Sequence, residues 1–174
     1  MDEPIPDPVD VIAAQWRRER PDLELAAMAV FGRLGRLLNV ATARIESVFT
    51  AHGLQRGEFD VLAALRRSGA PFELNPSVLA DTLMLSRAGM TGRLDRLEAA
   101  GLVRRIADRV DRRAVRVALT EHGRELVDTV VVAHTENETS MLSVLDPADR
   151  DALDRISRKL LWEWENPADP DPGN

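Results

Sequence analysis

The residues best suited to chemistry in this 174-residue chain are arginines, and they gather in one stretch. Residues 104 to 117 read RRIADRVDRRAVRV, in which six of fourteen residues are arginine and two are aspartate. The whole chain is nevertheless acidic, with a formal net charge of −6. Between Ser86 and Val117, nine arginines face four acidic residues, a net charge of +5, so the remaining residues carry −11. A segment with this charge attracts the phosphate backbone of a nucleic acid. The alternative interpretation is that the arginines only form a solvated surface.

A pair of short helices is predicted directly before the arginine stretch. Asn75 followed by Pro76 is a typical helix start, and Ser86 is a favourable cap for a second helix that Gly101 should end. In this second helix, apolar residues recur at spacings of four and three and form one buried stripe. The stripe consists of Met90, Leu94 and Leu97. Two short helices joined by a tight turn are typical of a helix-turn-helix.

Two alternating strands, at 102–106 and 114–119, are predicted after the helix pair, with a loop at 107–113 between them. The second helix fits the major groove, which is about 12 Å wide, and the hairpin can reach a neighbouring minor groove, where arginine is favoured. The expected DNA contacts are Ser86, Arg87, Thr91 and Arg93 on the helix and Arg109 and Arg112 on the loop. Asp111 lies among arginines and can hold one of them, so Asp111 and Arg113 are expected to stabilise the loop.

Helical periodicity predicts further helices on both sides of this unit. They are expected over 9–20, 22–52 and 58–69 before it, and over 121–143 and 147–165 after it. The fold class is therefore mainly α with a small β wing. We expect a tail at 1–9, N-terminal helices at 10–53, a DNA-binding lobe at 54–119, C-terminal helices at 120–165 and a second tail at 166–174.

More apolar surface is predicted on the terminal helices than a small lobe needs to bury. The long helix carries apolar residues at spacings of three and four, namely Phe31, Leu34, Leu38, Ala41, Ile45 and Val48, and the last helix carries Leu160, Leu161, Trp162 and Trp164. These residues could belong to the core of one chain. A homodimer through the N- and C-terminal helices is the favoured interpretation, because a two-fold symmetric operator also requires one.

The segments LSRAGMTGRLDRLEAAGLVRR and DRVDRRAVRVALTEHGREL closely resemble the MarR family of winged helix-turn-helix regulators. The family's wing carries an Asp-x-Arg element, matched by Asp111 and Arg113. An apolar strand and the start of a helix follow it, matched by Leu119, Thr120 and Gly123. The resemblance implies a homodimer whose terminal helices interlock and whose two winged lobes read a palindrome in double-stranded DNA.

Within the family, the chain is most similar to the urate-responsive branch of PecS- and TamR-like regulators. That branch has an extra N-terminal helix with a tryptophan, matched by Trp16, and an aspartate early in the helix before the helix-turn-helix, matched by Asp60. In that branch, an arginine in the region of the recognition helix, the second helix of the helix-turn-helix, pairs with the anionic ligand. Arg93 or Arg96 is the candidate in this chain. The branch's asparagine is absent, since Ser68 lies about where it would fall. The implied ligand is urate, another purine or an organic acid. Trp16 and Asp60 also have plain interpretations, as a packing anchor and as a favourable first-turn carboxylate.

Other classes of function lack support in the sequence. There is no cysteine, so a thiolate catalyst, a disulfide and a cysteine redox sensor are excluded. His52, His122 and His134 are too scattered for a typical metal site. No phosphate-binding loop or nucleophile motif indicates an enzyme, and no cofactor is expected. No apolar run could span a membrane, and the acidic N-terminus does not resemble a signal peptide, so the cytoplasm is the expected location. We therefore expect a ligand-responsive repressor, with a DNA binder lacking a ligand as the alternative.

Overall fold

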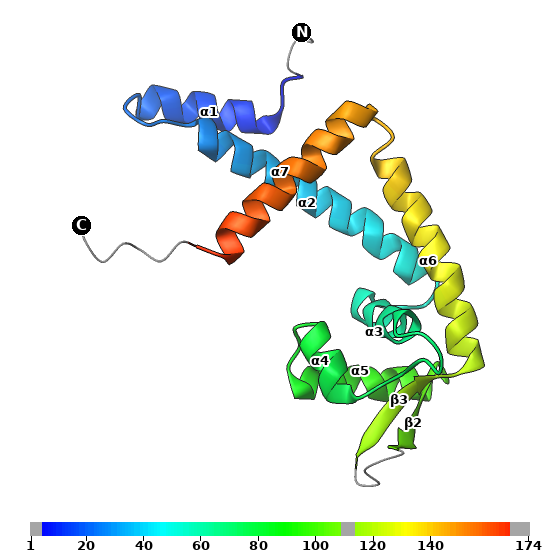
Figure 1. Ribbon diagram of the computed structural model, residues 1–174. Coiled ribbons are helices and arrows are strands. Elements are labelled where there is room, and N and C mark those ends of the chain that lie inside the picture. Colours follow the sequence, from blue (N-terminus) through cyan, green and yellow to red (C-terminus); the bar gives the residue numbers. More distant parts are fainter. Residues whose placement is uncertain (1–4, 109–113, 168–174) are drawn as a thin grey trace, which may run out of the picture. The chain divides into compact units, whose positions relative to one another are not determined.

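The computed structural model describes residues 5–108 and 114–167, and this part of the chain forms seven helices and three strands (Figure 1). The helices are α1 (Pro8–Glu19), α2 (Ala26–Ala51), α3 (Arg56–Arg67), α4 (Pro76–Thr82), α5 (Arg87–Ala99), α6 (Glu121–Met141) and α7 (Pro147–Glu165). The strands are β1 (Glu73–Leu74), β2 (Val103–Ala107) and β3 (Val115–Leu119). The chain divides into two compact units, residues 1–134 and 135–174. The expected division into functional segments stays a prediction.

The three strands form a small antiparallel sheet in the order β1-β3-β2. Strands β2 and β3 are the predicted hairpin, with Val103 opposite Leu119 and Ala107 opposite Val115. The short strand β1, which precedes the helix pair, pairs with the other edge of β3 through Glu73 and Ala118. The hairpin is thereby fixed to the segment that leads into α4.

Helices α4 and α5 form the predicted helix-turn-helix. The Ser86 hydroxyl accepts a hydrogen bond from the Gly89 amide at 3.1 Å, which caps α5 as expected. Its predicted stripe of Met90, Leu94 and Leu97 is buried. Gly101, which follows the helix, has a φ of +70°, a backbone conformation that favours glycine. Local sequence signals therefore determine both ends of this helix.

One hydrophobic core joins α3, α4 and α5 with the sheet and with parts of α2 and α6. At its centre Leu62, Leu65 and Leu79 are fully buried. The end of α2 contributes Phe49, whose ring stacks on Phe59 with centroids 4.5 Å apart. The first half of α6 contributes Val127 and Val130. The lobe that carries the helix-turn-helix thus includes residues on both sides of the predicted 54–119 segment.

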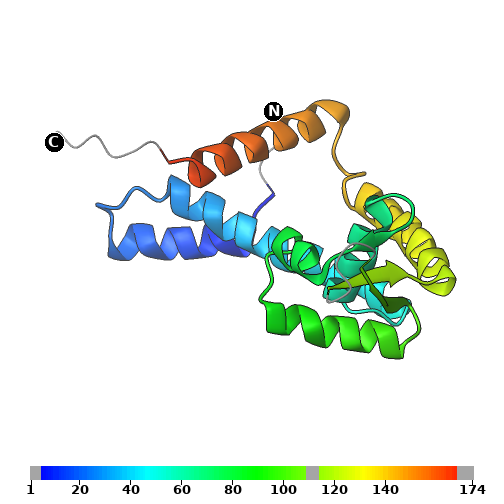
Figure 2. The ribbon, with the colours of Figure 1, turned by 60° about the horizontal axis from the view of Figure 1, so that its bottom comes forward.

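Helix α1 pairs with the N-terminal half of α2 in an antiparallel hairpin (Figures 1 and 2). Arg33 on α2 donates hydrogen bonds to Asp7 at 2.9 Å and to Asp10 at 2.5 Å. Val9 packs against Gly32, where a Cβ atom would lie 3.2 Å from a Val9 methyl group. The pKa of Asp10 is lowered by the Asp7 backbone amide and then by Arg33. The carboxylates that cap α1 therefore also hold it on α2.

Two helix starts differ from the sequence-based expectation. Helix α2 begins at Ala26, four residues later than predicted, because Asp22 pairs with Arg20 and the Glu24 carboxylate accepts from the Ala26 amide. Helix α3 begins two residues earlier, at Arg56. Its start is set by a capping box, in which Glu58 accepts the Gln55 amide at 2.8 Å.

Candidate nucleic-acid interface

The exposed side of α5 carries the residues expected to contact DNA. Ser86, Arg87 and Thr91 are exposed, and Ala88 and Gly89 between them are exposed and small. The Thr91 hydroxyl donates to the Arg87 carbonyl at 3.0 Å. A hollow of about 350 Å³ lies beside this side, lined by Pro76, Ser77, Arg87, Met90 and Thr91. The first two turns of α5 can thus approach a surface closely and present Arg87 to it.

Arg93 lies on the flank of α5 that meets α3. A Cβ atom added at Gly57 would lie 2.3 Å from the Arg93 Cζ atom, so the guanidinium rests directly on the first turn of α3. Asp60 is one turn further along α3 and is half-buried. The Arg93 guanidinium thus rests on α3 three residues before Asp60, another of the predicted ligand-binding residues. The same placement turns Arg93 toward α3, although it was expected on the DNA-facing side.

Arg96 is held by a carboxylate within the chain. Its Nε atom donates to the Glu58 carboxylate at 2.8 Å, and the Glu58 side chain is only 10% exposed. Glu58 also accepts the Gln55 amide, so one carboxylate caps α3 and fastens α5. Sequence reasoning missed Glu58. The Gln55-x-x-Glu58 spacing was the available signal for the cap, but nothing local indicated Arg96 as a partner.

Two further arginines of the positive stretch are also paired internally. Arg105 on β2 donates to Asp95 at 2.6 Å and to Glu98, both on α5. The Arg105 backbone amide and then its guanidinium lower the pKa of Glu98. This ion pair is therefore intact at pH 7, and it breaks as the pH falls through that lowered pKa. Arg116 on β3 lies between Glu73 and Asp108. Asp95, Glu98 and Asp108 are already counted in the net charge of +5, but Glu58 and Glu73 lie outside that segment, and including these two partners lowers the net charge to +3.

The tip of the wing lies outside the described residues. The expected DNA contacts Arg109 and Arg112 and the expected structural residues Asp111 and Arg113 all belong to it, so these four assignments stay predictions. The root of the hairpin is described. The Asp108 amide donates to the Ala114 carbonyl at 2.9 Å and closes the ladder before the loop.

Trp16 lies far from the other predicted ligand-binding residues of its own chain. Val9 packs beside Gly32, and Trp16 is two turns further along α1, toward the loop that leads into α2. Asp60 belongs to α3, which packs at the other end of α2 through Phe59. At 1.5 Å per residue, α2 separates the two by about 30 Å. One protomer therefore does not assemble the predicted pocket.

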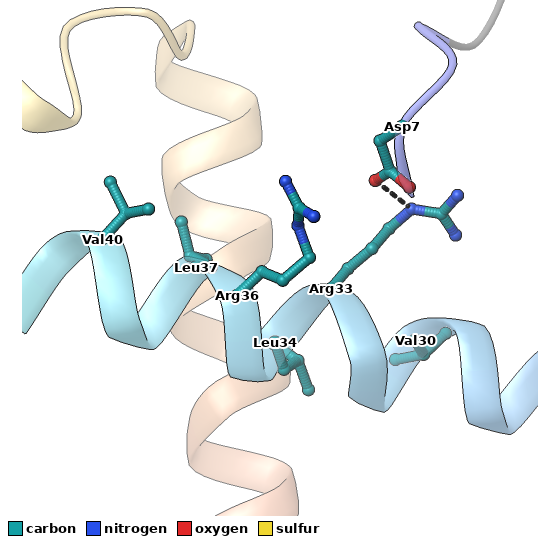
Figure 3. Close-up of a pocket in the computed structure, with 7 residues that line it drawn as sticks. All are labelled: Asp7, Val30, Arg33, Leu34, Arg36, Leu37 and Val40. Carbon is teal, nitrogen blue, oxygen red and sulfur yellow. Dashed lines mark hydrogen bonds and ion pairs between the residues drawn. The ribbon is translucent and has the colours of Figure 1, made fainter. Parts of the chain in front are cut away.

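The apolar face of α2 is open to solvent along its first half. Seven large apolar residues are exposed between positions 28 and 40, namely Met28, Val30, Phe31, Leu34, Leu37, Leu38 and Val40. A groove of about 530 Å³ runs along this helix, with Arg33, Arg36 and Asp7 beside the apolar residues (Figure 3). In the second unit, Leu161, Trp162 and Trp164 of α7 are also exposed. Exposed apolar surface of this extent is typical of an interface.

Histidine and acidic residues are dispersed over the part of the chain that the structure describes. Within residues 5–108 and 114–167, no group of three or more of them gathers in a way that could hold a metal ion. None of the helices in these ranges is long and apolar enough to cross a membrane.

Residues 52–114 match the model of the MarR family. Over 157 residues the chain is 41% identical to the transcriptional regulator PecS of Dickeya dadantii, covering 88% of this chain and 95% of PecS. The chain belongs to the MarR family. The resemblance seen in the sequence is thus confirmed, and the family is one of transcriptional regulators rather than enzymes.

Solved structures of MarR-family proteins share this fold. AbsC, a MarR-family regulator from Streptomyces coelicolor, superposes with a TM-score of 0.71 at 24% identity, covering 83% of this chain and 97% of AbsC. BpsR from Bordetella bronchiseptica superposes with a TM-score of 0.59 at 32% identity, covering 72% of this chain and 91% of BpsR. DNA binding by BpsR is regulated by 6-hydroxynicotinic acid. The predicted winged helix-turn-helix fold is therefore confirmed.

Proposed function

We propose that this MarR-family protein is a homodimeric repressor that binds a palindromic operator through α5 and the wing and is released by a small aromatic anion. The main support for this proposal is the arrangement of residues at the start of α5. Ser86 caps the helix, Arg87 and Thr91 are exposed on it, and the opposite stripe is fully buried. A helix fixed in this way can enter a major groove without disturbing its packing.

Salt-dependent binding of the full-length protein to duplex DNA tests this proposal. Lys and Arg contacts release counterions from DNA, so the logarithm of the binding constant should fall linearly with the logarithm of the salt concentration, with a slope near −0.9 per phosphate contact. We expect a slope of about −5 or steeper, and selection of a palindrome from random duplexes. A duplex affinity that is weak at low salt and independent of ionic strength would refute DNA binding.

The dimer is proposed from the open apolar faces. The exposed leucine, valine and phenylalanine side chains of α2 include Phe31, Leu34 and Leu38 of the seam predicted from the sequence. Helix α7 has no buried residue of its own. A second copy of the chain would cover such surfaces, and a two-fold dimer matches a palindrome.

The proposed ligand is a planar anion such as urate, another purine or an aromatic acid. Arg93 places a guanidinium on α3, the helix that carries Asp60, while the BpsR comparison offers a heteroaromatic acid as a precedent. An indole packs well on such a ring, and a guanidinium can pair with its charge. Because Trp16 is far from Asp60 in one protomer, a pocket containing both draws them from different protomers of the dimer. The same separation favours the alternative of a DNA binder without a ligand.

Trp16→Ala should remove the response to ligand and leave operator affinity within about twofold of the wild type. A ligand weakens DNA binding only by its difference in affinity between two states, and DNA must weaken ligand binding by the same factor. The measurement is DNA release by urate, 6-hydroxynicotinate and salicylate, with Trp16→Phe as the control that keeps a flat ring. If Trp16→Ala still releases DNA at the ligand concentration that acts on the wild type, the pocket lies elsewhere. If none of these ligands releases DNA from either protein, the alternative of a DNA binder without a ligand is favoured.

A further inference from the structure

A partly buried ionic network crosses the outer face of the wing sheet. Val117 and Leu119 of β3 point into the core, so Arg116 points to the opposite face. There its guanidinium reaches both neighbouring strands. It donates to the Glu73 carbonyl at 3.1 Å, its Nε atom lies 3.6 Å from the Glu73 carboxylate, and its Nη1 atom lies 3.4 Å from the Asp108 carboxylate.

The members of this network are poorly exposed for charged groups. The side chain of Glu73 is 7% exposed, that of Asp108 is 13% exposed and that of Arg116 is 30% exposed. Charges withdrawn from water in this way are costly unless they are paired. A solvent-facing wing needs no such arrangement for solubility, so the location of the network in the sheet is the guide to its role.

The position of the network indicates that role. Asp108 is the last described residue before the wing loop, and its amide closes the hairpin at Ala114. Glu73 belongs to β1, two residues before Asn75, which occupies the N-cap position of α4. Arg116 on the central strand therefore ties the root of the loop to the strand that enters the helix-turn-helix.

We propose that Arg116 is a positioning residue for DNA binding. Through Glu73 and Asp108 it fixes the root of the wing relative to α4 and α5, so that the arginines of the loop reach DNA while α5 occupies the major groove. The residue acts through the loop and does not itself contact DNA. This inference rests on the proposed function, since it assigns a task to residues behind the proposed interface.

For Glu73→Gln, simple electrostatics and the positioning role predict opposite changes in DNA affinity. The substitution keeps the shape of the side chain and removes one negative charge near DNA, so electrostatics alone predicts tighter binding. If Arg116 positions the wing through Glu73, binding should instead weaken about three- to tenfold at moderate salt. The magnitude of the salt slope should also fall by about one unit for each phosphate group that the wing no longer neutralises.

Two further variants distinguish a loss of wing positioning from a loss of folded protein as the cause of weaker DNA binding. Arg116→Met should weaken binding and flatten the salt slope as Glu73→Gln does, and Arg116→Lys should restore part of both, because it keeps the charge. Asp95→Asn is the matched control. It removes an exposed carboxylate that shares Arg105 with Glu98, and it should leave binding unchanged or slightly tighter. Each protein is assayed well below its own melting temperature.

The outcomes distinguish this inference from the proposed function. A wild-type protein that does not bind duplex DNA in a salt-dependent way refutes the proposed function. A wild-type protein that binds, together with Glu73→Gln that binds equally well or more tightly, overturns the positioning role alone. Weaker binding of Glu73→Gln and Arg116→Met with the wild-type salt slope also overturns it, because the wing would then still engage the same phosphate groups.

Discussion

Replacing Gly123 with alanine is expected to destabilise the protein by about 3 kcal/mol or more, because overpacking against immovable backbone lies at the upper end of core substitutions. A Cβ atom at this position would lie 1.9 Å from the Leu102 carbonyl oxygen and 2.8 Å from its carbon. That carbonyl cannot easily move aside. It accepts hydrogen bonds from the Thr120 amide at 3.1 Å and from the Thr120 hydroxyl at 3.2 Å.

Urea unfolding of Gly123→Ala, compared with the wild type, measures this effect. Gly92→Ala is the matched control within the same lobe, since its Cβ atom would meet only an Arg96 nitrogen at 3.9 Å. That control should be unchanged or more stable by up to about 1 kcal/mol, from the helix propensity of alanine. Equal stability of Gly123→Ala and the wild type would contradict the close approach of α6 to Leu102. The approach also gives a physical reason for the Leu119, Thr120 and Gly123 pattern on which the family resemblance rested.

In the proposed dimer, Arg87→Ala is expected to cost about 2–6 kcal/mol in operator affinity, because a bidentate arginine–guanine contact is worth roughly 1–3 kcal/mol and would be made once in each half-site. Arg87 is exposed in the first turn of α5, beside the small residues Ala88 and Gly89. The weakening should appear as a relaxed preference at one base pair in each half-site. Affinity for random duplexes should change far less.

A binding assay with single-base operator variants measures this preference. Arg67→Ala is the control, since Arg67 is an exposed arginine at the end of α3 and its removal changes the net charge equally. We expect Arg67→Ala to keep the wild-type ranking of operator variants. An equal weakening on all sequences by Arg87→Ala would make Arg87 a phosphate contact, and the assignment of base reading to it would be wrong.

Local features of the fold could be predicted from the sequence because they depend on neighbouring residues. The caps formed by Ser86 and Asp146, and the bond from the Gly123 amide to the Thr120 hydroxyl, lie within one turn of the helices they begin. The two strands of the hairpin begin and end within one residue of the predicted positions. The tip of the loop between them lies outside the described residues. Capping and alternation need no knowledge of tertiary structure.

The candidate site was only partly predictable, because its ion pairs join residues far apart in the chain. Glu58 pairs with Arg96 across 38 positions, and Glu73 lies 43 positions before Arg116. A count of charges treats every arginine alike, whereas the structure engages Arg96, Arg105 and Arg116 with carboxylates of the same chain. Only tertiary packing decides which guanidinium groups remain for a phosphate backbone.

The shared carboxylate of Glu58 makes two helices depend on each other. One of its oxygens accepts the Gln55 amide at the start of α3, and the other accepts Arg96 of α5. Fraying of the first turn of α3 would therefore withdraw a partner from α5, and displacement of α5 would leave the α3 cap with a less ordered acceptor. In amide hydrogen exchange, the first turn of α3 and the middle of α5 should open together as one cooperative unit.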